Sequence, residues 1–281
     1  MNDLRGRSFR NLKKVIYNFF MRLNRFFGKF DFKSETIRSS DEELINQLKN
    51  VLRLNNGDEI ILCDGKLNEA SCVIENIGRN EVVFRVIKVW QNKKEFSKDI
   101  VLYCSVLKRE NFELVIQKAV ELGVKEIVPI IARRTVKLGL REDRAQKIIK
   151  EAAEQSGRGI LPILSQEMPF SDAVAMAETN DINLFFACPE PAEGNDLGSN
   201  AQVNLLDSFN LDFSKYKKIG VFIGPEGGWA EEELEVVSLR DISRREKSSK
   251  FQVVGLSPFT LRAETAAIAA LSIITQQFYD R

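Results

Sequence analysis

The chain contains no histidine among its 281 residues, and its four cysteines form no Cys-x-x-Cys pair. The lack of histidine excludes Ser-His-Asp and Cys-His catalysis, so a general base must be a carboxylate, lysine, tyrosine, water or the substrate's own ionised form. Neither a metal site nor a disulfide framework is expected. Because each cysteine lies in or beside an apolar run, we expect buried, reduced thiols in a cytoplasmic protein. The cysteines are Cys63, Cys72, Cys104 and Cys188.

Long apolar runs are missing as well, since no stretch approaches the roughly 18 uncharged residues of a membrane span. The net charge of +1 gives no global attraction to nucleic acid. Basic residues are nevertheless concentrated in two segments. Residues 1–29 contain eight basic residues and one acidic residue, Asp3, and residues 133–150 contain seven basic residues and two acidic ones, Glu142 and Asp143. Such segments either dock phosphates or form solvated helix faces, and charge alone favours the solvated face.

The first thirty residues place apolar side chains at spacings of three and four, with basic residues between them. This is the pattern of a basic amphipathic helix, which can lie on an anionic membrane or act as an organellar presequence. The preferred interpretation is an N-terminal extension, residues 1–20, ahead of a domain that begins near Met21. No stable membrane association is expected.

The next segment is typical of a small barrel. From Arg25 to Trp90, short strand-like runs follow one another at about ten-residue spacing, separated by turn signals such as Asn56-Gly57-Asp58. A helix is expected from Ser39 to Leu54, with Ser40 as its N-cap. The polar stretch from Gln91 to Lys98 reads as a linker, which predicts domains at residues 21–92 and 99–281.

After the linker the period changes to alternating strands and helices, which predicts an α/β domain with a mostly parallel sheet covered on both faces. The expected strands are 100–107, 126–131, 182–187, 219–223 and 251–256. The expected helices are 112–122, 143–155, 170–178, 230–237 and one that begins near Ala263.

Two special loops lie in this second half. Ile223-Gly224-Pro225-Glu226-Gly227-Gly228 ends one apolar run, and Leu261-Arg262-Ala263-Glu264-Thr265-Ala266 follows another. Neither is a Gly-x-Gly-x-x-Gly or Gly-Lys-Ser/Thr motif. Glycines allow a ligand close to the backbone, and helix N-termini attract negative charge. Two such strand-loop-helix units suggest one composite pocket, in which Arg262 is hard to explain structurally.

In these motifs the chain resembles the 16S ribosomal RNA uridine-N3 methyltransferases of the SPOUT superfamily. Further matching segments are Met21 to Phe27, Val51-Leu52-Arg53-Leu54, Lys108 with Lys118, Glu121, Leu122 and Gly123, and Glu151 with Gln155 to Arg158. The sequence departs from the family pattern at Gln47 and Trp229, and at Leu256-Ser257-Pro258-Phe259, where an arginine is usual. That loss leaves one charge fewer beside the expected pocket.

The resemblance implies a PUA-like RNA-binding barrel followed by a trefoil-knot domain that binds S-adenosylmethionine and forms a homodimer. It implies catalytic roles for Arg262, which would stabilise negative charge on uracil, and for Glu226, which would accept the N3 proton or orient Arg262. The expected cofactor-binding residues are Ala187, Ile223, Gly224, Gly228, Leu256, Thr260 and Leu261. The expected RNA-binding residues are Arg25, Arg53, Lys108, Arg133, Arg134, Lys137 and Arg158.

Methylation of a uridine in 16S RNA or in the small ribosomal subunit is therefore the expected activity. Two alternatives stay open at this point. One is a SPOUT enzyme that acts on another RNA or another uridine atom. The other is a catalytically inactive RNA-binding or ribosome-assembly protein that retains the fold.

Overall fold

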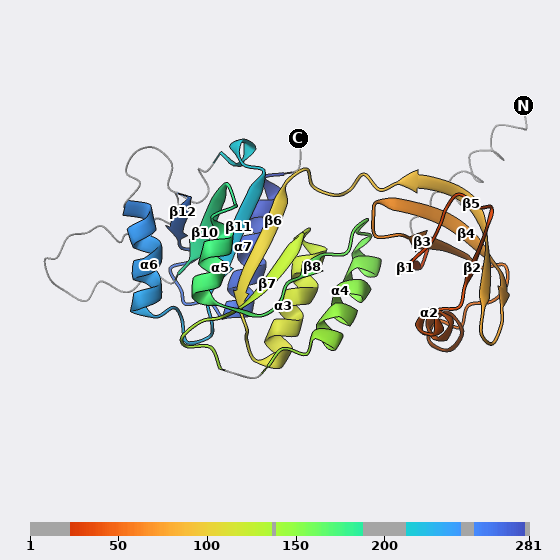
Figure 1. Ribbon diagram of the computed structural model, residues 1–281, viewed down its shortest axis with the longest axis horizontal. Coiled ribbons are helices and arrows are strands. Elements are labelled where there is room, and N and C mark those ends of the chain that lie inside the picture. The colour runs from red at the N-terminus through yellow and green to blue at the C-terminus, as the bar shows by residue number, and fades with distance from the viewer. Residues whose placement is uncertain (1–22, 137–138, 188–211, 243–249, 279–281) are drawn as a thin grey trace, which may run out of the picture. The chain divides into compact units, whose positions relative to one another are not determined.

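The computed structural model describes residues 23–136, 139–187, 212–242 and 250–278, which fall into two compact units (Figure 1). The boundary between the units lies between Lys93 and Lys94. The extension expected at residues 1–20 lies outside the described residues.

The first unit is built on a five-stranded sheet in the order β1-β3-β4-β5-β2. β1 and β3 run parallel, and the other three pairs are antiparallel. Alternate residues of the strands, such as Ile60 and Leu62, point into the core. The strands are β1 (Arg25–Phe27), β2 (Thr36–Ser39), β3 (Glu59–Cys63), β4 (Asn68–Ile77) and β5 (Val82–Gln91).

A helical segment supplies the rest of this core. It consists of α2 (Glu42–Asn46) and a π-helical turn (Gln47–Val51), and it buries Leu44 and Leu48. The expectation that Ser40 caps the helix is wrong. Asp41 is the N-cap, and its carboxylate accepts hydrogen bonds from the N–H groups of Glu43 and Leu44 at 2.9 and 3.2 Å.

The second unit contains a seven-stranded sheet in which every pair is parallel. The order is β12-β10-β11-β6-β7-β8, and β9 pairs with β7. The two-residue strands β8 and β9 were not expected from the sequence. The strands are β6 (Asp99–Ser105), β7 (Glu126–Ile131), β8 (Ile163–Leu164), β9 (Met168–Pro169), β10 (Ile182–Phe186), β11 (Lys218–Ile223) and β12 (Phe251–Val254).

Helices cover both faces of this sheet. Every residue from Ile100 to Ser105 in β6 is buried, although successive side chains point to opposite faces. α3 packs against α4 and α7, and α7 packs against β11. α5 packs against β7, and α6 packs against β12. The helices are α3 (Arg109–Glu121), α4 (Glu142–Ser156), α5 (Phe170–Ala177), α6 (Glu231–Ile242) and α7 (Ala263–Gln276), with a 3₁₀ turn at Phe213–Lys215.

Part of the segment expected to be a linker is packed into the second unit. Glu95 forms an ion pair with Arg158 at 2.9 Å, and Lys98 donates to the carbonyl oxygens of Phe213 and Tyr216. The polar composition of this segment therefore reflects specific buried and partly buried contacts of its charged side chains.

Candidate active site

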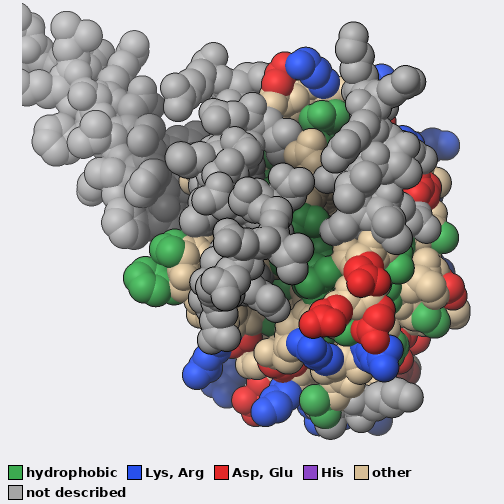
Figure 2. All heavy atoms as spheres, turned by 90° about the vertical axis from the view of Figure 1, so that its left-hand side faces the viewer, with side chains coloured by type: hydrophobic (Ala, Val, Ile, Leu, Met, Phe, Trp, Pro, Cys, Tyr) green, Lys and Arg blue, Asp and Glu red, His purple; other side chains and the backbone are tan. Residues whose placement is uncertain are grey.

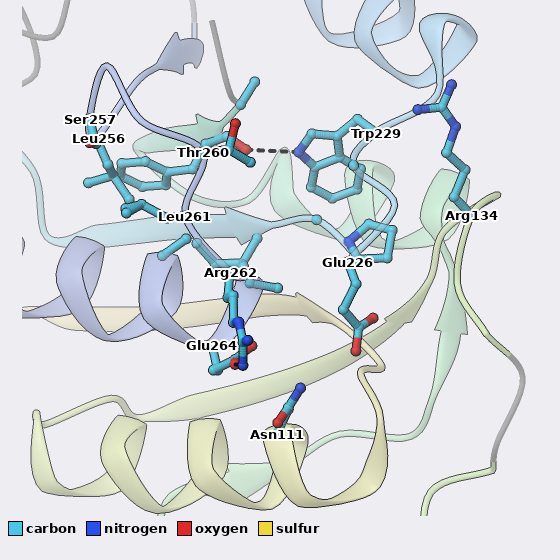
Figure 3. A pocket seen from close by; sticks show the side chains of 18 of the residues that line it. Asn111, Arg134, Glu226, Trp229, Leu256, Ser257, Thr260, Leu261, Arg262 and Glu264 are labelled. Atoms are coloured by element: carbon cyan, nitrogen blue, oxygen red, sulfur yellow. Dashed lines mark hydrogen bonds and ion pairs between the residues drawn. The ribbon is translucent and has the colours of Figure 1, made fainter.

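The end of β10 and the loops that follow β11 and β12 surround a pocket of about 640 Å³ (Figure 3). In a parallel sheet these loops leave the same edge, which is where open α/β folds bind ligands. The strands before the two special loops, β11 and β12, are not neighbours, because β10 lies between them. The end of β10, Phe186 and Ala187, consequently forms a third wall of the pocket.

Trp229 organises the loop after β11. Its indole Nε1–H donates to the carbonyl oxygen of Phe186 at 2.9 Å (Figure 3). Its ring packs against that of Phe185, with centroids 4.3 Å apart and an interplanar angle of 30°. A Cβ on Gly224 would lie only 2.9 Å from this indole. Gly224 is therefore required by Trp229 itself, in addition to any close approach of a ligand.

Arg134 contacts the other end of the same loop. Its Nη1 donates to the carbonyl oxygen of Gly227 at 3.1 Å, and a Cβ on Gly227 would lie 3.3 Å from the Arg134 Cβ. Gly228 has φ +71°, a conformation that favours glycine. The Gly-Pro-Glu-Gly-Gly turn is thus fixed between an aromatic side chain and a guanidinium.

Glu226 leaves this loop towards the start of α3. Its Oε1 accepts a hydrogen bond from the backbone N–H of Lys108 at 2.9 Å, and Lys108 occupies the N-cap position of α3. No ion pair joins Glu226 to Arg262 among the described residues. The observed contact of Glu226 therefore docks the loop on α3.

Arg262 and Glu264 stand at the start of α7. Arg262 is the N-cap residue and its side chain is 85% exposed, whereas the Glu264 side chain is 11% exposed. Arg262 Nη1 lies 4.0 Å from Glu264 Oε1. Figure 3 shows both side chains on the side of the pocket where Asn111 and Glu226 also lie.

The structure brings most of the expected site residues together. Arg262, Glu226, Lys108 and Arg134 all line this pocket. The seven expected cofactor positions also do so, namely Ala187, Ile223, Gly224, Gly228, Leu256, Thr260 and Leu261. Sequence reasoning missed Asn111 and Phe186 as lining residues, and it missed Phe259, which is 78% exposed at the pocket.

Other expected RNA contacts lie elsewhere, and two of them are held in ion pairs, Arg158 buried and Arg25 partly buried. Arg158 is 7% exposed, and its guanidinium pairs with Glu95 and donates to the carbonyl oxygens of Val120 and Val124. Arg25 pairs with the buried Glu69 in the first unit. These contacts favour structural roles for both arginines over the RNA contacts expected from the sequence.

The remaining basic residues of that set are exposed or lie outside the described residues. Arg53 is exposed in the first unit, with φ +54°. Arg133 pairs with Glu232 of α6 at 3.0 Å, and both side chains are largely exposed. Lys137 lies outside the described residues. Figure 2 shows acidic and basic side chains next to one another on the side of the molecule where α6 lies, so the positive charge there is partly offset.

Two of the described cysteines have raised pKa values. Burial raises the pKa of Cys104 well above its usual range, and the charge of Glu226 raises it further. Burial also raises the pKa of Cys72 to about 12. Cys63, Cys72 and Cys104 are buried and outside any disulfide, as expected, and Cys188 lies outside the described residues. The raised pKa values disfavour nucleophilic catalysis by Cys72 and Cys104, because the thiolate is the reactive form.

Among the described residues, no group of three or more cysteine or carboxylate side chains is arranged to hold a metal ion. None of the described helices is long and apolar enough to cross a membrane.

A family model of the RNA methyltransferase domain matches residues 94–275, and a model of the RNA methyltransferase PUA domain matches residues 41–87. The chain belongs to this RNA methyltransferase family. The resemblance seen in the motifs is therefore confirmed, and the first unit is PUA-like.

Several similar proteins are named ribosomal RNA small subunit methyltransferase E. Ribosomal RNA small subunit methyltransferase E of Bacillus subtilis is 29% identical over 241 residues, which cover 84% of this chain and 88% of that protein. Ribosomal RNA small subunit methyltransferase E 2 of Borreliella burgdorferi is 32% identical over 239 residues, which cover 83% and 88%. The crystal structure of the Neisseria gonorrhoeae methyltransferase E bound to S-adenosyl methionine covers 92% of this chain and 98% of its own, with a TM-score of 0.72 and 25% identity.

Proposed function

We propose that the protein transfers a methyl group from S-adenosylmethionine to N3 of a uridine in 16S ribosomal RNA. The observation that carries this proposal is the pocket at the carboxyl edge of the parallel sheet, built from the two special loops and the end of β10. The names of the similar proteins and the ligand of the Neisseria gonorrhoeae structure support it.

The composition of the pocket fits this cofactor. Its volume of about 640 Å³ lies within the usual range for a small-molecule site. Phe186, Trp229 and Leu256 offer apolar surface for an adenine ring, and Glu226 offers negative charge for a sulfonium or an ammonium group. When bound, the cofactor supplies a methyl group on a positively charged sulfur.

The side chains of this pocket can provide positioning and charge. Removal of the N3 proton leaves negative charge on the uracil O2 and O4 atoms, and Arg262 is an exposed guanidinium at the pocket that can stabilise it. Glu226 holds the glycine loop against α3 through Lys108. The loops that surround the pocket would keep the reacting groups in place, which is a large part of catalysis of a group transfer.

The RNA and the oligomeric state belong to the same proposal. The PUA-like unit would bind RNA, and Arg53, Lys108 and Arg134 are the exposed basic residues that would contact phosphate. The C-terminal unit would form a trefoil knot and a homodimer in the cytoplasm. Its all-parallel sheet and the position of the pocket at its edge are compatible with that arrangement.

The proposal is tested by mapping methylated nucleotides by mass spectrometry in 16S RNA from a strain that lacks this protein. We expect one N3-methyluridine to disappear and to return when the wild-type protein is supplied. Calorimetric titration with S-adenosylmethionine should show saturable binding. An unchanged methylation map combined with no saturable heat would overturn the proposal and favour a cofactor-free RNA-binding protein.

A further inference from the structure

Glu264 is a buried carboxylate with an oxygen that has no partner. The residue is 8% exposed, and its Oε2 makes no hydrogen bond with any described residue. Its Oε1 has Arg262 at 4.0 Å, which is too long for a direct hydrogen bond. The position of Glu264 in the first turn of α7 stabilises its charge in part. A carboxylate oxygen that is removed from water without a hydrogen bond still raises the free energy of the folded protein.

Another buried glutamate of the same unit has hydrogen bonds to both of its carboxylate oxygens. Glu233 is 7% exposed, but its Oε1 accepts from the N–H of Arg133 at 2.8 Å and its Oε2 from the N–H of Ala230 at 2.9 Å. It completes the first turn of α6 in the manner of a capping box. Because both of its oxygens are satisfied, Glu233 has a sufficient structural explanation, and Glu264 does not.

The pocket offers two glutamates to a substrate, and their environments differ. Glu226 is exposed, and one of its oxygens is occupied by the Lys108 N–H. Glu264 lines the pocket wall with a free oxygen and little contact with solvent. With no histidine in the chain, a carboxylate is the remaining common type of side chain for moving a proton near neutral pH.

We propose that Glu264 accepts the N3 proton of the uridine during methyl transfer, an inference that rests on the proposed function. In this step the N3–H bond breaks and the proton moves to a Glu264 carboxylate oxygen. The N3 electron pair forms the new N–CH₃ bond, and the electrons of the S–CH₃ bond return to sulfur, which leaves as the neutral thioether of S-adenosylhomocysteine. Glu264 then returns the proton to water.

The neighbouring arginine makes the charge balance favourable. Before the step, the negative charge is on Glu264, 4.0 Å from the Arg262 guanidinium. After the proton moves, Glu264 is neutral and the negative charge is on the uracil. The same guanidinium, 85% exposed on the pocket side of α7, then stabilises the negative charge of the uracil anion. One arginine thus stabilises the charge in both places, and no buried carboxylate is left unpaired.

The main test replaces the carboxylate by its isosteric amide. Glu264→Gln should lower kcat by ~10²- to 10⁴-fold, the range for loss of a general base. Its rate should keep rising with pH as the uridine ionises in solution, whereas the wild-type rate should level off earlier. The affinity for S-adenosylmethionine, the affinity for RNA and the dimer content should each stay within about twofold. Glu264→Asp should recover part of the rate.

Two matched variants serve as controls. Glu226→Gln should retain the wild-type pH profile, because the amide oxygen still accepts from Lys108. Glu142→Gln removes an exposed carboxylate from the first turn of α4, away from the pocket, and should leave the rate unchanged. A changed pH profile in Glu226→Gln but not in Glu264→Gln would assign the proton to Glu226 and overturn the proposal.

A substrate that ionises more readily gives an independent readout. Fluorine at C5 lowers the pKa of the uracil N3, so RNA that carries 5-fluorouridine should restore most of the lost rate to Glu264→Gln and much less to Arg262→Ala. Absence of this rescue would overturn the proposal.

Parallel loss of rate and of S-adenosylmethionine affinity in Glu264→Gln would instead assign the glutamate to the cofactor's ammonium group, and loss of dimer would assign it to the partner subunit. A wild-type enzyme that methylates another atom would refute the proposed function itself.

Discussion

At the scale of single residues, the exposure of Arg262 separates a catalytic role from a structural one. The side chain is 85% exposed, and its ion pair with Glu264 is 4.0 Å long. A pair of this length, in which the cation lies in solvent, contributes at most about 1 kcal/mol to stability. Arg262→Ala should therefore melt close to the wild-type temperature while turnover falls by ~10²-fold or more.

The conservative variant makes this prediction sharper. Arg262→Lys should recover only part of the rate, because a compact ammonium group cannot reproduce the planar, two-donor fork of a guanidinium. The affinity for S-adenosylmethionine should change little in both variants. Kinetics and a melting curve on the same preparation check the prediction, and a stable, fully active Arg262→Ala enzyme would contradict it.

Arg158 illustrates what a sequence motif does not reveal about a residue. Its match to the family motif predicted an RNA contact, but the side chain lies inside the second unit with Glu95 and two carbonyl groups. Arg158→Ala would leave the mostly buried Glu95 carboxylate without its cation. Such a loss costs about 3–5 kcal/mol of unfolding free energy.

We therefore expect Arg158→Ala to lower the midpoint of urea denaturation strongly. The salt dependence of RNA binding by the fraction that remains folded should not change. Arg109→Ala is a suitable control, because its pair with Glu113 is at 3.4 Å and Arg109 is mostly exposed. A stable Arg158→Ala protein with a flatter salt dependence would restore the RNA-contact interpretation.

The pocket itself shows which site residues could be found from the sequence. Glycines, an arginine and a glutamate in two loops were visible as motifs, and these loops do meet at one pocket. Asn111 carries no local signal, because it enters the pocket only through the packing of α3 near α7. The unpartnered oxygen of Glu264 is equally invisible in a sequence, since burial and hydrogen bonding follow from tertiary structure.

At the scale of elements, hydrophobic periodicity predicted the long helices and the buried strands well. The predicted range 126–131 agrees with β7, because this strand is an apolar run between turn signals. β8 and β9 were missed, since two residues cannot display a period. The strand order was also out of reach, because β10 pairs with β11 and β12 across long separations in the chain.

The start of α2 gives a direct test of local structure. Ser40 fits a capping box in the sequence, but the carboxylate of Asp41 makes the two capping hydrogen bonds. Asp41→Ala should therefore lower the unfolding free energy of the first unit by about 1 kcal/mol. Ser40→Ala is the matched control and should have almost no effect in urea denaturation. A larger loss of unfolding free energy in Ser40→Ala than in Asp41→Ala would identify Ser40 as the N-cap.

At the scale of the whole molecule, the pocket and the PUA-like unit lie in different units of the chain. Every residue that lines the pocket belongs to the unit that begins at Lys94. The cofactor and the RNA are therefore expected to depend on different parts of the chain. The overall charge of +1 makes this division testable, because RNA attraction must come from local basic residues.

We expect a protein that consists of residues 94–281 to bind S-adenosylmethionine with the affinity of the full chain. Its RNA affinity should fall, and the slope of log affinity against log salt should flatten by about one unit for each phosphate contact that the PUA-like unit makes. In the full chain, Arg53→Ala should remove about one such unit. Arg133→Ala should remove less, because Glu232 already offsets its charge. Calorimetry and a salt series on the same proteins measure both effects. An unchanged salt slope in residues 94–281 would place all of the RNA contacts in the C-terminal unit.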